Sequence, residues 1–456
     1  MEHELDLIVI GWGKGGKTLA GTMARAGQRV AIVEASDRMY GGTCINIGCV
    51  PTKALIHDAE TRTGNGFDPG YFDTAVQRRD KLTAAMRAKN FSMLDDLDSV
   101  MTITGRAAFI GPRCIRIQAG DETLELGAKR IVINTGAVPQ VPDLGSVRIG
   151  GRIHDSTTLQ HAPLPKSLVV VGGGYVGTEF ASMFAHFGSK VTVLDRGPRA
   201  LKKEDEDVAA EVIGALGDVG VEVRTGASVQ GIGQDAGSAR VSYVQDGQTH
   251  EIEADAVLIA LGRTPATDGL DLASAGIERT DSGAIKVDDY LRTTAEGVYA
   301  LGDVNGGPQF TYVSLDDNRI VADAILGAGT RSTADRIAVP STIFTTPPLA
   351  RVGLSEEAAR ARGLDIKVAV KKVAEIAAMP RPKIVGDPRG IIKFVVDANT
   401  DLVLGAALMH VDSQEVVNLV ALAMRQGVTS ATLRDSIFTH PSSTEALNEV
   451  LGTFSR

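Results

Sequence analysis

The sequence has few cysteines, no excess of positive charge and no long apolar run, and each absence excludes a class of protein. Three cysteines in 456 residues are too few for a disulfide-stapled fold, so a close pair favours catalysis or metal binding in a reducing compartment. The formal net charge of -9 argues against binding to nucleic acid or to an anionic membrane, because both attract lysine and arginine. No apolar run reaches the roughly 18 residues of a membrane-spanning helix. The first residues, "MEHELDL", are acidic where a secretory signal is basic, so we expect a cytoplasmic protein.

The sequence does contain an internal repeat of strand, glycine turn, helix and strand, at residues 5–35 and again at residues 167–196. The turns carry Gly11, Gly13 and Gly16 in the first copy and Gly172, Gly174 and Gly177 in the second. A carboxylate closes each copy at the same distance from the first glycine, Glu34 in one and Asp195 in the other. Glycines allow close approach of a pyrophosphate, the helix N-terminus attracts it, and the acid accepts hydrogen bonds from a ribose. Two dinucleotides are therefore predicted, one held permanently and one exchanged.

Three further stretches place small or acidic residues after apolar strands. "RIVINTGAVP" and "AVLIALGRTP" each end a strand in a turn of small residues, which contain Thr135, Gly136 and Gly262. "GVYALGDVNGG" places Asp303 just after another strand, where a carboxylate can bind a ribityl or ribose hydroxyl. These turns are typical of the edge of a dinucleotide-binding sheet.

The close cysteine pair lies in "GGTCINIGCVPTK", with Cys44 and Cys49 five positions apart. In a regular helix this spacing separates the Cα atoms by about 8 Å, too far for a disulfide. We therefore expect a distortion at Gly48 and a regular helix only after Pro51. The helix N-terminus and Lys53 should favour the thiolate form, which makes the pair reactive.

Together these motifs, with "FTHPSSTE" near the C-terminus, resemble those of the class I pyridine nucleotide-disulfide oxidoreductases, over essentially the whole chain. The resemblance implies bound FAD, exchanged NAD(P)H and a homodimer. It implies an α/β fold with two Rossmann-like dinucleotide-binding domains and a C-terminal αβ dimerisation domain. The expected ranges are 1–146 with 265–335 for FAD, 147–264 for NAD(P) and 338–456 for dimerisation.

The resemblance also assigns roles to residues. Cys49 would lie next to the flavin and Cys44 would meet the substrate, while Lys53 would approach flavin N5 and pair with Glu179. Tyr175 is similar to an aromatic lid that moves when nicotinamide docks. His440, oriented by Glu445, would be an acid/base group supplied to the partner subunit. The implied FAD site comprises Gly11, Gly13, Gly16, Glu34, Gly42, Thr43, Lys53, Thr135, Gly136 and Asp303. The implied NAD(P) site comprises Gly172, Gly174, Tyr175, Gly177, Asp195, Arg196 and Gly262.

Features around Asp195 bear on the choice of nicotinamide cofactor. Its carboxylate would repel the 2′-phosphate of NADPH, whereas Arg196, Arg199 and Lys202 follow closely and could accept it. We expect NADH to be preferred and NADPH to be usable.

The electron acceptor is less sharply indicated. Within the family, "GKGGKTLA", "MYGGTCINIGC", "FTYVSLDDNRIV" and "VDSQEVVNLV" resemble bacterial copper(II) reductases of the reactive-chlorine defence, and soft thiolates suit Cu(I). Residues after Glu445 include no cysteine, so mercuric ion and thioredoxin are disfavoured. A low-molecular-weight disulfide reductase, a dihydrolipoamide dehydrogenase and a non-enzymatic flavin-thiol sensor remain as alternatives. No dedicated metal site is predicted. Met379, Met409 and His410 could add ligands for a metal ion, but we expect them to be packing or surface residues, and we expect Cys114 to be a small core residue.

Overall fold

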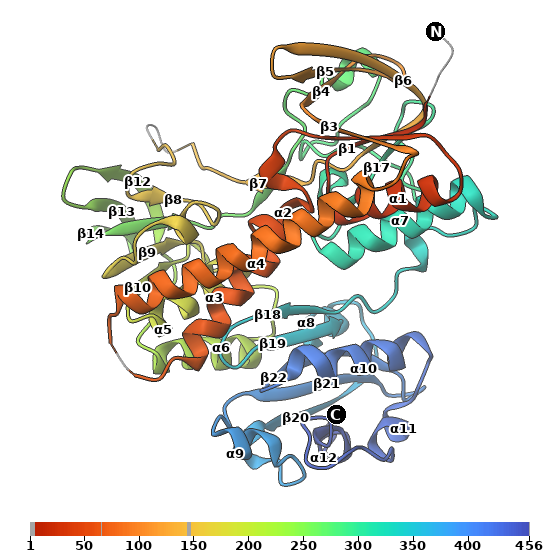
Figure 1. Cartoon of the computed structure of the whole chain (residues 1–456). Helices are drawn as coiled ribbons and strands as arrows, with labels where there is room; N and C mark the ends of the chain where they lie inside the picture. The colour runs from red at the N-terminus through yellow and green to blue at the C-terminus, as the bar shows by residue number, and fades with distance from the viewer. Residues whose placement is uncertain (1–4, 65, 144–146, 456) are drawn as a thin grey trace. The chain divides into compact units, whose positions relative to one another are not determined.

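The apolar run Leu5–Ile10 forms a buried strand, β1, in the computed structural model, which describes residues 5–64, 66–143 and 147–455. β1 pairs in parallel with β2 (Val30–Glu34) and with β6 (Glu122–Ile133). Helix α1 (Lys14–Arg25) connects β1 to β2 and packs beside α7 (Thr311–Leu326), as Figure 1 shows. Continuous apolar strands of this kind are typical of parallel sheets that are covered on both faces.

The sheet around β1 has the order β3-β2-β1-β6-β5-β4, and β17 also pairs with β6. The glycine turn at Gly11 follows β1 in its parallel part, whereas β6 continues into an antiparallel extension with β5 and β4. The bounds of the remaining strands are β3 Val100–Thr104, β4 Arg106–Gly111, β5 Cys114–Ala119 and β17 Val298–Ala300. A two-stranded antiparallel ribbon, β7 (Ala137–Pro139) with β16 (Arg263–Pro265), follows the ends of this sheet.

The second repeat builds its own parallel sheet, with the order β11-β10-β9-β15-β8. Its strands are β8 Ile153–His154, β9 Ser167–Val171, β10 Lys190–Leu194, β11 Glu222–Arg224 and β15 Ala256–Ile259. Helices α5 (Tyr175–His186) and α6 (Glu206–Asp218) connect its strands. An antiparallel meander completes it, β12 Ser228–Gln234, β13 Ala239–Gln245 and β14 Gln248–Ala254.

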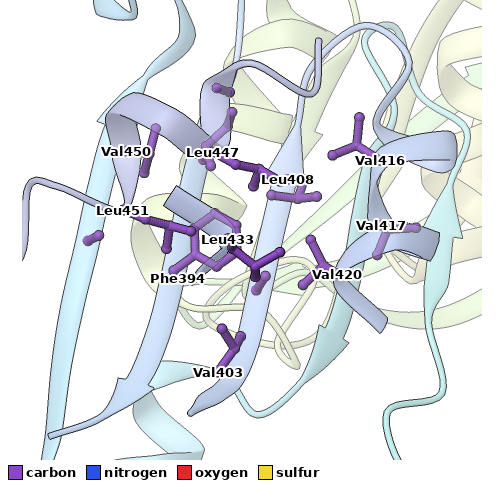
Figure 2. Packing of buried hydrophobic residues seen from close by; sticks show 14 of the residues in the cluster. Phe394, Val403, Leu408, Val416, Val417, Val420, Leu433, Leu447, Val450 and Leu451 are labelled. Atoms are coloured by element: carbon purple, nitrogen blue, oxygen red, sulfur yellow. The ribbon is translucent and has the colours of Figure 1, made fainter. Parts of the chain in front are cut away.

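The C-terminal part is an antiparallel sheet of order β18-β19-β22-β21-β20 with helices packed against it. Its strands are β18 Ser341–Ile343, β19 Leu349–Gly353, β20 Ile366–Lys372, β21 Ile391–Asp397 and β22 Val403–Met409. Its helices are α8 Glu356–Ala361, α9 Arg381–Val385, α10 Ser413–Arg425, α11 Ser430–Arg434 and α12 Ala446–Val450. Figure 2 shows Phe394 and Leu408 from the strands packing with Val420 and Leu447 from the helices. Each such buried side chain stabilises the fold by about 1.5–3 kcal/mol.

The chain divides into two compact units. One contains the residues up to Leu55, Asp73–Gln140 and Gly262–Asp335; the other contains Ile56–Phe72, Val141–Leu261 and the residues from Arg336 on. The α/β class with Rossmann-like parallel sheets is confirmed. The finer division into three domains stays a prediction, and its boundary at residue 146 lies outside the described residues. Within the described ranges, none of the helices has the length and apolar character needed to cross a bilayer.

Candidate active site

The first glycine turn brings the backbone of β1 against the end of β6. Gly11 has a φ of +95°, and a Cβ there would lie 2.4 Å from the carbonyl oxygen of Asn134, so only glycine fits. The carboxylate of Glu34 accepts a hydrogen bond from the N–H of Trp12 at 3.0 Å. Burial raises the pKa of Glu34 above its usual range. A partly enclosed carboxylate beside a glycine turn suits the ribose of a dinucleotide.

Asn134 is a residue that the sequence analysis missed. Its Oδ1 accepts a hydrogen bond from the N–H of Gly16 at 2.9 Å, and its Nδ2 donates to the carbonyl of Leu301 at 2.6 Å. The side chain therefore joins the first turn of α1 to the segment that follows β17. The signal in the sequence was an asparagine at the end of the apolar strand "RIVIN".

The two cysteines predicted to be reactive lie on separate helices. Cys44 belongs to α2 (Gly42–Asn46) and Cys49 begins α3 (Cys49–Thr61), with a break between them at Ile47 and Gly48. The predicted distortion is therefore present, but the expectation that the helix begins only after Pro51 is wrong. Thr52 extends the helical turn backwards, since its N–H and its hydroxyl both donate to the carbonyl of Gly48, at 3.1 and 2.7 Å.

The cysteine motif touches the first glycine turn through its backbone. Gly42, at the start of α2, has a φ of +72°, and a Cβ there would lie 2.7 Å from the Cα of Gly13. Gly48 lacks a side chain for a related reason, since a Cβ there would lie 3.2 Å from the carbonyl oxygen of Thr43. These close approaches place the thiols next to the turn predicted to bind the FAD pyrophosphate.

The thiols occupy different electrostatic environments. The Cys44 thiol donates a hydrogen bond to the sulfur of Cys49 and so lowers the pKa of Cys49 to about 6; Thr311 and the charge of Lys53 act in the same direction. The same hydrogen bond and burial raise the pKa of Cys44 well above its usual range. In the reduced pair, Cys49 is thus the thiolate and Cys44 the proton carrier.

Two residues around the thiols were also missed. The hydroxyl oxygen of Thr311, at the N-terminus of α7, lies 3.5 Å from the sulfur of Cys49. Lys17, on α1, is half-buried and donates to the side chain of Asn90. Burial lowers the pKa of Lys17 to about 8, and its charge favours the thiolate of Cys44. Neither residue follows from the cysteine motif, because both belong to distant segments.

The remaining predicted FAD residues lie in turns of the same unit. The hydroxyl of Thr135 donates to the carbonyl of Ala266 at 2.7 Å, and Gly136 has a φ of +77°. Asp303 lies in the turn after β17, where burial raises the pKa of its carboxyl group. Thr43 follows Gly42 in α2, and Lys53 lies one turn into α3.

The second glycine turn repeats the geometry of the first. The carboxylate of Asp195 accepts hydrogen bonds from the N–H of Gly173 at 2.8 Å and from that of Gly197 at 2.7 Å. Gly174 faces open space, so a ligand can approach its backbone. Gly177 packs the helix against the strand, since a Cβ there would lie 1.9 Å from the carbonyl oxygen of Gly172. The arrangement fits a second dinucleotide.

The other residues predicted for the nicotinamide cofactor differ in their surroundings. Arg196 and Lys202 are exposed after β10, whereas Arg199 is held by Glu357 at 3.1 Å and by the carbonyl of Glu204 at 2.9 Å. Gly262 is exposed with a φ of +117°, between β15 and β16. Glu179, in α5, accepts a hydrogen bond from the N–H of Phe344 at 2.8 Å.

His440 and Glu445, which are predicted to act as an acid/base pair, lie in contact. Nδ1 of His440 lies 2.9 Å from one carboxylate oxygen of Glu445, and the N–H of Ser442 donates to the other at 2.8 Å. Although burial opposes it, the hydrogen bonds from His440 and Ser442 hold the pKa of Glu445 below its usual range. The His440 side chain is 71% exposed, so its ring is accessible from outside its own unit.

The methionines and the histidine considered as additional metal ligands are packing residues, whereas Cys114 lies outside the core. Met379, Met409 and His410 are fully buried, and burial lowers the pKa of His410 to about 4. Cys114 is half-buried rather than in the core, because it begins β5 at the tight turn where Arg113 has a φ of 58°. Across residues 5–64, 66–143 and 147–455, His, Cys, Asp and Glu side chains form no group of three or more that could hold a metal ion.

Known proteins resemble this chain over its whole length. A family model for "Pyridine nucleotide-disulphide oxidoreductase" matches residues 5–317, and a model for the dimerisation domain of that family matches residues 339–451. The probable pyridine nucleotide-disulfide oxidoreductase RclA of Escherichia coli is 46% identical over 98% of this chain and 99% of its own. A mercuric reductase of Lysinibacillus sphaericus is 32% identical over 100% of this chain and 83% of its own.

Solved structures agree with the sequence relatives. The Cu(II) complex of the HOCl-induced flavoprotein disulfide reductase RclA from Escherichia coli superposes with a TM-score of 0.93. The two chains are 45% identical, and the match covers 99% of each.

Proposed function

Because the chain belongs to the pyridine nucleotide-disulfide oxidoreductase family, we propose that it passes electrons from NAD(P)H to Cu(II) or a related metal ion through FAD and the Cys44–Cys49 pair. Members of this family are enzymes that use FAD and NAD(P)H, and these are the cofactors of this chain. The metal ion is a substrate in this proposal, and the physiological setting is defence against oxidative or metal stress.

Bound FAD supplies the hydride acceptance that lets a two-electron donor reduce a disulfide. Glu34 binds its adenosine ribose, Asp303 its ribityl chain, and the turn at Gly11 and Gly13 its pyrophosphate. Asp195 binds the ribose of the exchanged nicotinamide cofactor, and Tyr175 moves aside when that cofactor docks. The pairing of Lys53 with Glu179 near the flavin belongs to the same proposal.

The thiol pair carries the metal reduction. Cys49 is the thiolate and Cys44 the thiol, an assignment supported by the direction of their pKa shifts. Two Cu(II) ions accept one electron each, the Cys44–Cys49 disulfide forms, and the Cys44 proton is released to solvent. Soft thiolate ligands suit Cu(I), so reduction of copper at the thiol pair is chemically reasonable.

One observation favours Cu(II) over the other possible electron acceptors. Over 99% of its length the chain resembles a solved flavoprotein disulfide reductase whose structure contains Cu(II) and whose description calls it HOCl-induced. That complex belongs to the relative and supports, for this chain, a proposal of the same substrate.

A second candidate function, reduction of a low-molecular-weight disulfide or of lipoamide, is favoured by the pair of His440 and Glu445. A disulfide acceptor leaves a thiolate that must be protonated, and an imidazole held by a carboxylate performs that step. A metal acceptor has no such leaving group. The role of His440 therefore separates the two functions.

The dimerisation domain supports a homodimer. We propose that each subunit supplies His440 to the thiol pair of its partner, and the exposure of the His440 ring is consistent with this. The scarcity of cysteines and the thiolate character of Cys49 support a cytoplasmic location, where thiols stay reduced.

The experiment is an anaerobic acceptor panel with the FAD-loaded enzyme and NADH, comparing Cu(II), Hg(II), oxidised glutathione, lipoamide and quinones. Copper reduction should saturate and fall at least about tenfold in Cys44→Ser, whereas His440→Ala should change it little. If a disulfide turns over much faster than Cu(II) and His440→Ala abolishes that activity, the copper assignment is wrong.

A further inference from the structure

The phenol of Tyr175 is tied to a buried carboxylate. Its hydroxyl donates to Oε1 of Glu204 at 2.6 Å, a short hydrogen bond of the charge-assisted kind. Burial and the charge of Glu204 raise the pKa of Tyr175 to about 12, so the phenol remains a donor at every physiological pH. The Glu204 side chain is 3% exposed, so water has little access to replace this partner.

Arg351 completes the arrangement. Its Nη1 lies 2.9 Å from Oε1 of Glu204, the same oxygen that Tyr175 uses, and 3.4 Å from the Tyr175 hydroxyl. The same nitrogen donates to the carbonyl of Lys203 at 3.1 Å. A nearly buried carboxylate needs a cation to stay ionised, and Arg351 supplies it from β19 of the C-terminal sheet.

Ionic contacts also hold the segment that carries Glu204. The carboxylate of Asp205 accepts the N–H groups of Glu356 and Glu357 at 3.0 Å each, at the start of α8. Lys393, with a 5% exposed side chain, lies 3.2 Å from Asp205 and 2.8 Å from Glu356. Glu204 is thus presented to Tyr175 from a fixed position.

We propose that Glu204, neutralised by Arg351, is a positioning residue that latches the Tyr175 ring in the position described here, from which the ring must move when the nicotinamide cofactor docks, and so limits binding of that cofactor. The inference rests on the proposed movement of Tyr175 when that cofactor docks. Movement of the ring breaks the hydrogen bond to Glu204, so the binding-competent state is a minor one. The apparent dissociation constant is then the intrinsic constant divided by the open fraction.

The arrangement also makes the C-terminal sheet a determinant of cofactor affinity. Arg351 and Tyr175 belong to segments 176 residues apart, one on the dimerisation sheet and one on the helix that begins at the second glycine turn. A change in β19 that moves the guanidinium would alter nicotinamide binding without touching the cofactor.

The test uses the FAD-loaded enzyme and stopped-flow reduction of the flavin by NADH under anaerobic conditions. Tyr175→Phe retains the ring and deletes only the donor, while Glu204 keeps Arg351 as its partner. Loss of a charge-assisted hydrogen bond should lower the apparent dissociation constant for NADH about tenfold. Glu204→Gln should lower it about threefold or more, since a neutral amide is the weaker acceptor.

A double-mutant cycle distinguishes a latch from a general structural effect. In the Tyr175→Phe background, Glu204→Gln should change the constant by less than about twofold, because the bond it weakens is already absent. Glu211→Gln is the matched control: it removes an ion pair between α6 and Lys372 of β20 but does not touch Tyr175, and it should leave the constant unchanged.

An unchanged constant in Tyr175→Phe, or additive effects of the two substitutions, would overturn the latch. Those results would leave the proposed function intact as long as NADH or NADPH reduces the wild-type flavin. A wild-type flavin that neither cofactor reduces would instead overturn the proposed function, and this inference with it.

Discussion

Nδ1 of His440 is bound to Glu445 at 2.9 Å, which leaves Nε2 as the ring nitrogen that can exchange a proton with a substrate. Glu445→Gln removes the carboxylate that orients the imidazole and should slow reduction of oxidised glutathione or lipoamide by at least about tenfold. Copper reduction should change by less than about twofold, because no leaving thiolate forms. Steady-state rates with each acceptor at saturating NADH measure the contrast.

Glu449→Gln is a suitable control, since Glu449 lies on the neighbouring helix α12, pairs with Lys371 and does not contact His440. Equal losses for copper and for disulfides in Glu445→Gln would contradict the assignment of His440 as the proton donor.

The pKa of Cys49, lowered to about 6, predicts a pH dependence of the two-electron-reduced enzyme. The thiolate is fully present above about pH 7 and is lost as the pH falls through 6, so the long-wavelength thiolate-to-flavin absorbance should fade over that range. Cys49→Ser should bind FAD, lack the band and fail to reduce the acceptor. A band of wild-type strength in Cys49→Ser would assign the proximal thiol wrongly.

Thr311→Val tests the cause of this shift. Its hydroxyl favours the thiolate of Cys49, so its loss should move the midpoint of the absorbance change to higher pH. Thr345→Val, in which the lost hydroxyl donates to the carbonyl of Pro347, should leave the midpoint where it is.

The surroundings of Asp195 predict a preference for NADH. Its carboxylate repels a 2′-phosphate, and Arg199 is already engaged by Glu357 and by a backbone carbonyl. NADPH should be usable through the exposed Arg196. The ratio of kcat/KM values measures this, and a value for NADPH more than about tenfold above that for NADH, about 1.4 kcal/mol, would refute it.

His410 predicts a loss of stability in acid. Its pKa is about 4 in the folded protein, against an ordinary value of 6.5, so folding disfavours its protonated form. The full stability is present above about pH 6.5 and decreases as the pH falls towards 4, by up to about 3 kcal/mol. The His410→Leu variant should show a shallower decrease in the free energy of unfolding by urea between pH 7.5 and pH 5. Equal slopes for the variant and the wild type would contradict this origin.

The geometry of both glycine turns could be predicted from the sequence, because the same short pattern of glycines and a closing acid produces the same backbone contact in each copy. In each copy, the N–H one residue after the first glycine, that of Trp12 or of Gly173, donates to the closing carboxylate. The residue spacing alone determines this geometry once the strands are parallel and adjacent.

The residues that the sequence analysis missed could not be found from a local pattern, because their contacts join segments that meet only in the folded chain. Thr311 lies 262 residues from Cys49, and Arg351 lies 147 residues from Glu204. Nothing in the cysteine motif or in the lid sequence specifies these partners. The error at Pro51 was local: a proline near the first turn was taken as the helix start, whereas the side chain of Thr52 begins it earlier.

The contact of Gly42 with Gly13 also limits how the enzyme can be altered. A Cβ at Gly42 would lie 2.7 Å from the Cα of Gly13, so the two segments meet as bare backbone with no side chain between them to exchange. Even the single methyl group of an alanine at Gly42 would push the glycine turn and the cysteine helix apart. At this contact the glycine turn and the cysteine helix therefore cannot be altered independently of each other.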